Sequence, residues 1–494
     1  MDFIKINETD NVAVAIHTQS KDKVVTIAGQ SLTLCGDIAA GHKVALQDFK
    51  VGDNIVKYGF PIGHATVPIR KGEPVNEKNI RTNLEGLTDY SYNPKVMPVK
   101  VSSHQLTFKG YRRKNGSVGV RNEIWIIPTV GCVNGVANRL GEILKAETKG
   151  VGVDAIVSFN HNYGCSQLGD DYENTRNILR DMILHPNAGA VLVVGLGCEN
   201  NQPEALRQLL GDYDEERIRF LVTQQVDDEM EAGARILHEL YELASKDERT
   251  DVSLSELKIG LKCGGSDGFS GITANPLLGR FSDFIVSHGG TTVLTEVPEM
   301  FGAETLLMER CKNKETFDKT VRLINDFKSY FLANSQPIYE NPSPGNKAGG
   351  ISTLEEKSLG CTQKSGVSPV CDVIEYGETL RTHGLNLLSA PGNDLVASTA
   401  LAAAGCQLLL FTTGRGTPFG SFVPTVKIST NTRLYDKKRG WIDFNAGTLM
   451  EDETMPVLLE RFIDFVVGVA SGAQANNEKN GYREIAIFKS GVTL

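Results

Sequence analysis

The first ninety residues alternate short apolar runs with glycine-centred turns. The runs 12–16, 23–27 and 55–58 are rich in Val and Ile, and no long helical pattern separates them. Closely spaced β-type runs between turns are typical of small all-β modules. We therefore expect an all-β module over residues 1–88, followed by a linker over 89–108, where Pro, Ser and Asn interrupt any regular pattern.

From Asn122 the pattern changes to repeated units of strand, glycine loop and helix. Apolar runs that each lead into a polar loop and a helical pattern lie at 123–130, 154–159, 190–194 and 218–222. This alternation predicts mostly parallel sheets covered by helices. A charged stretch at 245–251 interrupts the alternation, which then resumes at 257–262. The pattern thus predicts a multidomain α/β protein, with one α/β domain over 109–248 and another over 249–494.

Composition narrows the class of protein. The chain has 494 residues, of which 40% are hydrophobic and 22% charged, as in ordinary globular proteins. Its longest apolar run, 400–411, is much shorter than the roughly 20 residues that span a membrane. A formal charge of -9 disfavours nucleic-acid binding. Nine cysteines in no dense framework, without a leader-like start, predict reduced thiols in the cytoplasm.

Four cysteines follow predicted strands directly: Cys132, Cys165, Cys198 and Cys263. Ligands bind at the carboxyl ends of strands in open α/β sheets, and His161 lies close to Cys165 in the sequence. Thiolate and imidazole ligands suit iron or zinc, although the spacing is not that of a zinc ribbon. These five residues are therefore candidate metal ligands. The alternative is that each cysteine is simply a small buried apolar side chain.

Two glycine-rich loops are candidates for anion binding. The loop with Gly264, Gly265, Ser266 and Asp267 offers backbone N–H groups, and neither it nor 195–197 matches the dinucleotide fingerprint. In the loop 414–418, Arg415 offers a guanidinium for a carboxylate, with Thr417 beside it. The equally weighted alternative is that Arg415 caps neighbouring backbone carbonyls. His42 and Lys43 lie on a loop of the β module.

Taken together, these motifs resemble the altronate and galactarate dehydratase family of hydro-lyases. The resemblance covers almost the whole chain. It rests on Asp10–Val14, Gly41–Leu46, Val130–Gly135, Tyr163–Asp171, Gly195–Asn201, Cys263–Gly268, Ser270–Pro276, Asn341–Lys347 and Phe411–Phe419. The segment 358–363, with Cys361, resembles the altronate branch, because galactarate dehydratases lack this cysteine.

The resemblance implies an N-terminal β-clip (SAF-type) module, a linker, a dimerising α/β domain and a C-terminal Rossmann-like domain of unusual topology. It also implies removal of water from D-altronate to give 2-dehydro-3-deoxy-D-gluconate in hexuronate (galacturonate) catabolism. Ferrous iron is the implied cofactor, with Mn²⁺ as a substitute. The implied setting is a cytoplasmic homodimer that acts on a small sugar acid, with no nucleic-acid or membrane partner.

Dehydration of a sugar acid needs a base for the C2 proton, an acid for the C3 hydroxyl and a cation or donors for the enediolate. On the resemblance we expect iron among His161, Cys165, Cys198 and Cys263, with Cys132 a weaker candidate. Substrate carboxylate would meet Arg415 or the amides of 264–266, near Asp267 and Thr417. His42, beside Lys43, is expected to be an acid/base or a further ligand, and Lys364 an alternative base.

Three other functions remain open from the sequence. A dehydratase of a related sugar acid, such as galactarate, would share most of the motifs. A nucleotide-dependent oxidoreductase could use the glycine loops, but it lacks the acidic residue expected about 20 positions after a G-x-G-x-x-G loop. A non-catalytic sugar-acid-binding protein would bind without turnover.

Overall fold

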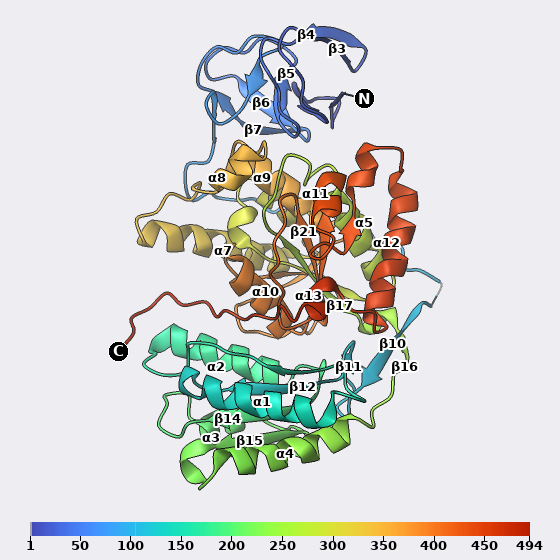
Figure 1. Ribbon diagram of the computed structural model, residues 1–494. Coiled ribbons are helices and arrows are strands. Elements are labelled where there is room, and N and C mark those ends of the chain that lie inside the picture. Colours follow the sequence, from blue (N-terminus) through green and yellow to red (C-terminus); the bar gives the residue numbers. More distant parts are fainter. Residues whose placement is uncertain (1, 104) are drawn as a thin grey trace.

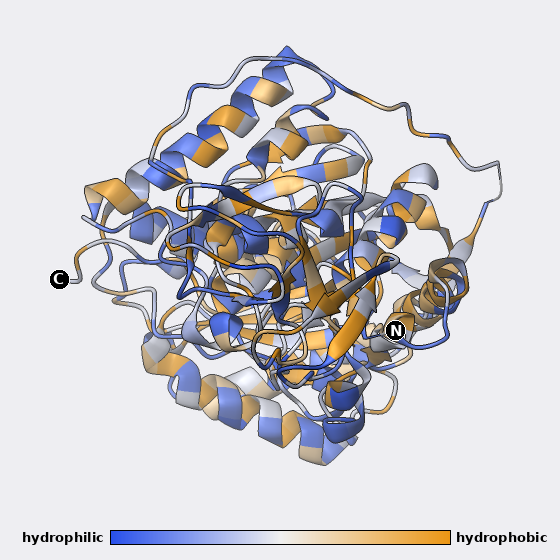
Figure 2. Cartoon of the chain, turned by 90° about the horizontal axis from the view of Figure 1, so that it is seen from above, coloured by the Kyte–Doolittle hydropathy of each residue, from blue (hydrophilic) through white to orange (hydrophobic). Residues whose placement is uncertain are grey.

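Three bodies are stacked in the computed structural model, which describes residues 2–103 and 105–494 (Figure 1). The β module lies at one end and the domain that begins near residue 109 at the other, so the C-terminal domain is in the middle. Figure 2 shows hydrophobic strands gathered near the centre, with helices of mixed hydropathy around them. An all-β module followed by α/β domains with parallel sheets confirms the predicted fold class. No helix in the described part of the chain is long and apolar enough to cross a membrane.

The β module consists of two small sheets and a hairpin. Their orders are β1-β2-β5-β8, β6-β7-β9 and β3-β4. The bounds are β1 (Phe3–Ile4), β2 (Val12–Ala15), β3 (Val24–Ile27), β4 (Gln30–Thr33), β5 (Lys43–Ala45), β6 (Asn54–Lys57), β7 (Phe60–Ala65), β8 (Pro74–Val75) and β9 (Ile80–Arg81). Every residue of β2 is buried, because apolar side chains cover both of its faces. The strand therefore lies between two apolar cores of the module.

The segment that follows lies along the C-terminal domain. Its described residues form no helix or strand between β9 and β10 (Thr107–Arg112). The backbone N–H of Lys95 donates to the carbonyl of Glu309 at 2.6 Å, and the rings of Tyr92 and Phe317 are 5.2 Å apart. His104, within the predicted linker, lies outside the described residues.

The second body is a four-stranded parallel sheet, ordered β13-β12-β14-β15, between two pairs of helices. Helices α1 and α4 cover one face with a core of their own, whereas α2 and α3 cover the other. That second core continues into the C-terminal domain, where Trp125 packs against Phe422. The bounds are β12 (Glu123–Pro128), β13 (Ala155–Ser158), β14 (Ala188–Gly195), β15 (Ile218–Val222), α1 (Asn134–Thr148), α2 (Gly169–Ile183), α3 (Pro203–Leu210) and α4 (Glu229–Ala244).

Two chain crossings join this body to the next. Strand β10 pairs antiparallel with β11 (Val118–Gly119) and with β16 (Thr250–Ser253). The entry to the second body and the exit from it therefore form one small three-stranded sheet.

The C-terminal domain has a seven-stranded parallel sheet, ordered β19-β20-β18-β17-β21-β22-β23. Its strands are β17 (Lys258–Cys263), β18 (Thr291–Leu294), β19 (Val370–Ile374), β20 (Gly384–Leu388), β21 (Leu408–Thr413), β22 (Thr425–Ser429) and β23 (Phe444–Asn445). The first strand in the sequence, β17, is the central one, because later strands lie on both sides of it. A crevice for ligands is expected at its carboxyl end.

Helices cover both faces of this sheet. Helix α5 packs against β18, β20 and β21 with α12 outside it, whereas α10 packs against β17 and β21 and meets α2 of the second body. The bounds are α5 (Ala274–Ser287), α6 (Glu304–Met308), α7 (Lys314–Ala333), α8 (Pro344–Ala348), α9 (Leu354–Cys361), α10 (Asp394–Ala403), α11 (Thr432–Lys437), α12 (Met455–Ala470) and α13 (Asn476–Lys479).

Candidate functional site

Buried charged and thiol groups meet at the carboxyl end of the central strand. Cys263 ends β17, and Glu299 ends the 3-10 helix η4 (Val297–Glu299) that follows β18. Cys361 ends α9, which runs into the 3-10 helix η5 (Thr362–Ser365) that carries Lys364. Three segments far apart in the sequence are thus brought to the crevice that the strand order creates.

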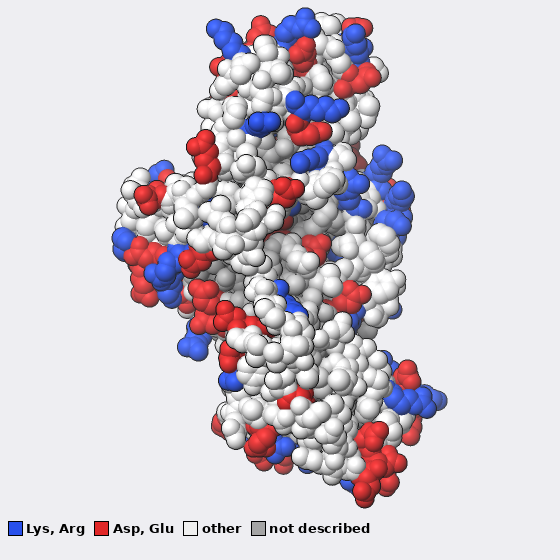
Figure 3. Space-filling view, turned by 90° about the vertical axis from the view of Figure 1, so that its left-hand side faces the viewer, with Lys and Arg blue, Asp and Glu red and all other residues white. Residues whose placement is uncertain are grey.

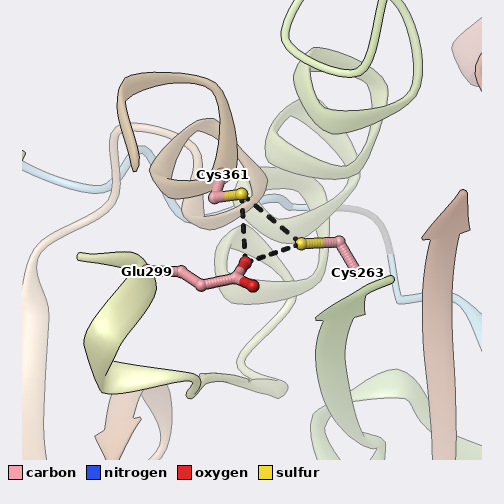
Figure 4. Close-up of side chains that lie close together, drawn as sticks. All are labelled: Cys263, Glu299 and Cys361. Carbon is pink, nitrogen blue, oxygen red and sulfur yellow. Dashed lines mark hydrogen bonds between the residues drawn. The ribbon is translucent and has the colours of Figure 1, made fainter. Parts of the chain in front are cut away.

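Two thiols and one carboxylate form the centre of this group (Figure 4). The sulfurs of Cys263 and Cys361 are 3.4 Å apart, and each lies 3.2 Å from Oε2 of Glu299. All three side chains are buried, and their ligand atoms lie within 4.8 Å of one another. Two thiolates and one carboxylate are a donor set that suits a divalent transition metal such as iron or zinc. Among the described residues, this is the group with metal-ligand geometry.

Three buried lysines surround the thiols and balance the carboxylates. Lys364 Nζ lies 2.8 Å from Cys263 Sγ, and Lys357 Nζ lies 2.7 Å from Glu299 Oε1. The Lys262 ammonium contacts the carboxylates of Glu296 and Asp394. Three ammonium groups then face three carboxylates (Glu296, Glu299 and Asp394), so the group is neutral while both cysteines are thiols. Loss of the two thiol protons would therefore leave two negative charges, which one divalent cation would balance.

The same neighbours set the protonation states. Burial alone would raise the pKa of Glu299, but Lys357, Lys364 and Lys262 lower it to about 2. The hydrogen bond with Cys263, together with burial, holds the pKa of the Cys361 thiol well above its usual value. Burial would lower the pKa of Lys364, yet Cys263 and Glu296 raise it well above the ordinary value. Lys364 is therefore a charged group, better suited to donate a hydrogen bond than to act as a base.

The backbone at Glu296 is held in an unusual conformation. Its φ of 65° lies in the left-handed region, which a residue with a β-carbon seldom adopts. The turn allows the buried Glu296 carboxylate to reach Lys364 at 3.2 Å. Backbone strain of this kind is concentrated at functional sites, where the surrounding structure enforces it.

The β module is anchored beside this group by a buried ion triad. Lys43 and Lys57 reach opposite oxygens of Glu356 on α9, at 2.8 and 2.7 Å. Lys43 also donates to the carbonyl of Gly350 and the hydroxyl of Ser352, both at 2.8 Å. We predicted Lys43 to be a catalytic residue. In the structure all three hydrogens of its ammonium group are donated to the C-terminal domain, so its role is to dock the module.

Backbone packing at the same junction brings His42 to the edge of the C-terminal domain. A β-carbon on Gly268 would lie 2.0 Å from the carbonyl oxygen of Gly41, so the two loops approach as only glycine permits. His42 Nε2 lies 3.4 Å from the carbonyl oxygen of Ala348, and the ring is half-buried. Burial, together with the charge of Lys43, lowers its pKa, which favours the neutral imidazole.

A narrow cleft lies between the module and the C-terminal domain and is lined by residues of both. Tyr58 lines it from the module, and Lys357, Cys361 and Ser266 line it from the other side. The thiol-carboxylate group and the buried ion triad thus both have a member in its wall. Figure 3 shows Lys, Arg, Asp and Glu interspersed on one face of the molecule, with no continuous basic surface there.

The predicted substrate loops lie side by side, as neighbouring strands require. Backbone N–H groups of Gly414 and Arg415 donate to the carbonyl of Gly265, and that of Gly264 donates to Thr412. The Arg415 guanidinium, however, donates to the carbonyl of Gly345 at 2.7 Å, which is the capping role weighed as its alternative.

The polar members of these loops are largely engaged. The Asp267 carboxylate is buried, and it accepts hydrogen bonds from Thr430, Asn431 and Ser270. Thr417 Oγ1 accepts from the backbone of Phe419, and the carbonyl of Ser266 accepts from Asn346. Asp267 therefore acts first as a structural hub between the two loops, and Ser266 reaches the cleft.

The structure separates Cys263 from the other four predicted metal ligands. Cys132, Cys165 and Cys198 follow β12, β13 and β14, whereas Cys263 follows β17 of a separate sheet. Both ring nitrogens of His161 are engaged, Nε2 with the carbonyl of Pro128 at 2.7 Å and Nδ1 with the N–H of Tyr163 at 3.1 Å. The prediction assumed that all four strands end at the edge of one sheet. Because they belong to two sheets, Cys263 and the other four residues do not form one ligand set.

Several residues of the site were missed by the sequence analysis. Glu296 and Glu299 follow the apolar run 291–295 as directly as Cys263 follows its own strand, which was an available signal. Cys361 was noted only as a mark of the altronate branch. The buried lysines Lys262 and Lys357 gave no signal, because lysine is seldom fully buried.

Comparisons with known proteins agree with this architecture. Family models match three consecutive parts: the altronate/galactarate dehydratase SAF domain at residues 1–83, the second domain of D-galactarate dehydratase/altronate hydrolase at 110–245, and the C-terminal D-galactarate/altronate dehydratase domain at 254–493.

Full-length relatives extend the match. The chain is 60% identical to an altronate dehydratase of Bacillus subtilis, covering 100% of this chain and 99% of the relative. It is 59% identical to an altronate dehydratase of Escherichia coli, covering 100% of both. Identity to the E. coli galactarate dehydratase (L-threo-forming) is 33%, over 98% of this chain and 96% of the relative. With three consecutive domain matches and relatives of this identity, the chain belongs to the altronate/galactarate dehydratase family of hydro-lyases.

Proposed function

We propose that the chain removes water from D-altronate to give 2-dehydro-3-deoxy-D-gluconate, in the catabolism of hexuronates such as galacturonate. The observation that carries this proposal is the identity of 59–60% to two altronate dehydratases over the whole chain, against 33% to a galactarate dehydratase. Cys361 supports the same choice, because the residue that resembles the altronate branch lies in the buried site. The proposed setting is a homodimer in the cytoplasm.

The proposed cofactor is Fe²⁺, with Mn²⁺ as a substitute, at Cys263, Glu299 and Cys361. The fit rests on the donor chemistry and on the charge balance, in which two thiol protons can be exchanged for one divalent cation. Bound there, such an ion supplies Lewis-acid stabilisation of negative charge on the substrate. This set replaces the earlier one, which shared only Cys263 with it.

The chain's own residues supply the remaining requirements. Lys357 lines the cleft, and burial would lower its pKa, but Glu299 and the two cysteines raise it, so that it carries a positive charge. Its Nζ already donates to Glu299, Asn341 and Asn346, so Lys357 would stabilise the enediolate as a fixed nearby positive charge. Lys364 adds a second fixed charge behind Cys263. Ser266 and the adjoining loop are placed to orient the hydroxyl groups of the substrate.

His42 is the proposed general base. Replacing it with Gln is expected to lower kcat/KM by about 10²–10⁴-fold, the usual contribution of a positioned base. Because the pKa of His42 lies below its ordinary value of 6.5, the neutral form dominates at pH 7. The rate of the unmodified enzyme should therefore hold at neutral pH and fall as the solution is acidified past that lowered pKa. Measurement of kcat/KM against pH checks this, and the variant should lose that dependence.

His64 provides the matched control for this experiment. It lies in the same module, where its Nδ1 bonds to the side chain of Asn83 at 2.8 Å. His64→Gln should leave both the rate and the pH profile unchanged. An H42Q enzyme with the pH profile of the unmodified enzyme would remove His42 from the mechanism.

The substrate proposal is tested by an anaerobic assay after loading with Fe²⁺. D-Altronate, galactarate and other six-carbon sugar acids are supplied in parallel, and 2-keto-3-deoxy products are measured. Turnover is expected with altronate, at the highest kcat/KM of the panel. A higher kcat/KM with galactarate would show that galactarate, not altronate, is the substrate. Binding of altronate without product, or turnover only with added NAD, would overturn the dehydratase proposal itself.

A further inference from the structure

Three exposed thiols lie at one edge of the second body, outside the site described above. Cys132, Cys165 and Cys198 follow β12, β13 and β14, which are neighbours in one parallel sheet (Figure 1). Each is preceded by glycine in the sequence. Free cysteines are among the most buried residues of proteins, so three exposed ones at adjacent strand ends need an explanation other than packing.

The three loops that carry these thiols are fixed to one another. The N–H of Gly131 donates to the carbonyl of Tyr163 at 3.1 Å, and that of Asn201 donates to the carbonyl of Gly164 at 3.0 Å. Ser166 N–H donates to the Asn200 side chain at 2.7 Å. At Gly164 a β-carbon would lie 2.0 Å from the carbonyl oxygen of Thr129. Each cysteine loop is therefore held directly against the next.

Buried polar groups brace this edge from below. The Glu199 carboxylate is buried and accepts hydrogen bonds from Thr129 Oγ1 and from the N–H groups of Leu196 and Gly197. His161 holds the neighbouring loop through both ring nitrogens. The thiols themselves are nearly free of partners: among the described residues, Cys165 and Cys198 have only sulfur contacts of 3.9 and 3.8 Å. Buried polar groups therefore hold in place three loops whose thiols have few partners of their own.

The three sulfurs are not gathered closely enough to hold a single ion. A single ion with metal–sulfur bonds of about 2.3 Å needs sulfurs within roughly twice that length of one another. These three do not all lie within 4.8 Å of each other, and all three are free thiols rather than disulfides. A group wider than one ion fits such a frame, and iron–sulfur clusters are held by cysteine thiolates. We infer that Cys132, Cys165 and Cys198 form a three-thiol site for a [4Fe–4S] cluster.

Loading can proceed by ligand exchange without any change of oxidation state. A thiolate-ligated cluster brings four iron–sulfur(thiolate) bonds. Each protein thiol forms one new bond to iron, and its proton passes to the thiolate that leaves, which departs as a free thiol. After three exchanges the fourth iron keeps its exchangeable ligand, because the protein supplies no fourth cysteine at this edge among the described residues.

The test uses the full chain and a preformed, thiolate-ligated [4Fe–4S] cluster under anaerobic conditions. After desalting, iron, acid-labile sulfide and the electron paramagnetic resonance of the reduced sample are measured. The unmodified chain should retain roughly four irons and four sulfides per chain. Cys132→Ser, Cys165→Ser and Cys198→Ser should each fall to the level of the triple variant. Iron retained without sulfide, or equal retention by the triple variant, would overturn the inference.

Two controls separate this site from the rest of the molecule. Cys35→Ser removes an exposed thiol of the β module and should leave cluster loading unchanged. Cys361→Ser should abolish altronate turnover while it keeps the cluster, so the two proposals fail separately. If a cysteine variant does not fold, the alkylation of each thiol is measured in the unmodified chain loaded with the cluster. Cys132, Cys165 and Cys198 should then be protected, whereas Cys35 should react. Equal reactivity of all four would count against the site.

Discussion

Cys361→Ser is expected to abolish altronate turnover and to remove the divalent ion from the C-terminal domain. Cys361 supplies one of two sulfurs that lie 3.2 Å from the Glu299 carboxylate. A Lewis-acid ion contributes several kcal/mol to stabilising developing charge. At about 1.36 kcal/mol per tenfold change in rate, its loss lowers kcat by at least about 10³-fold. The measurement is kcat with altronate, together with metal content after anaerobic loading with Fe²⁺ alone. Glu299→Gln should behave in the same way.

Cys371→Ser is the matched control for this substitution. Its sulfur lies in β19 at the edge of the same sheet, where it donates to the carbonyl of Pro369 at 3.5 Å. This variant should retain both the ion and full turnover. A C361S enzyme that binds one equivalent of Fe²⁺ and keeps its rate would show that the ion lies elsewhere.

Glu356→Ala is expected to weaken the docking of the β module severely. Both oxygens of this buried carboxylate are paired, with Lys43 and Lys57, and removal would leave two ammonium groups buried without their partner. Breaking a buried ion pair from one side typically costs about 3–5 kcal/mol. The free energy of unfolding should fall by about that amount, as measured by denaturant titration. Limited proteolysis should show the module cut earlier than the rest of the chain.

The same triad predicts an acid dependence of stability. Burial alone would raise the pKa of Glu356, but Lys43 and Lys57 lower it from 4.5 to about 2. The contribution is therefore complete above the unfolded value of 4.5 and is lost as the pH falls from there through about 2. Glu8→Ala, which removes an exposed carboxylate of the same module, should change neither stability nor its pH dependence. Equal losses in both variants would show that net charge, not the triad, is responsible.

The domain classes could be predicted from the sequence because local patterns determine them. Short apolar runs between glycine turns give the β module, and repeated strand–loop–helix units give the parallel sheets. The site was harder to predict, because it depends on which strands share a sheet. Cys165 and Cys263 both follow strands, but the strands belong to different sheets, and Cys263 meets Glu299 and Cys361 instead. No local pattern carries that information.

Buried lysines were the second obstacle. Lys43, Lys57, Lys262 and Lys364 are all fully buried, although hydropathy places lysine at the surface. Each is stabilised by a carboxylate or thiol from a distant segment: the partner of Lys43 is 313 residues away, and that of Lys364 is 101 residues away. Such pairings become visible only in three dimensions. Glu296 and Glu299, by contrast, could have been found by reading the end of every predicted strand as closely as the cysteines were read.

The segment between β9 and β10 is pinned to the C-terminal domain at Tyr90, Tyr92 and Lys95, while Leu87 remains exposed. This segment is thus packed against the C-terminal domain and is not a flexible linker. What aligns the module is the glycine contact at Gly41 and the carboxylate of Glu356, both independent of chain continuity. A nick at Leu87 would therefore leave two fragments that remain associated in register, and a split gene producing the two pieces separately could still yield one complete cleft.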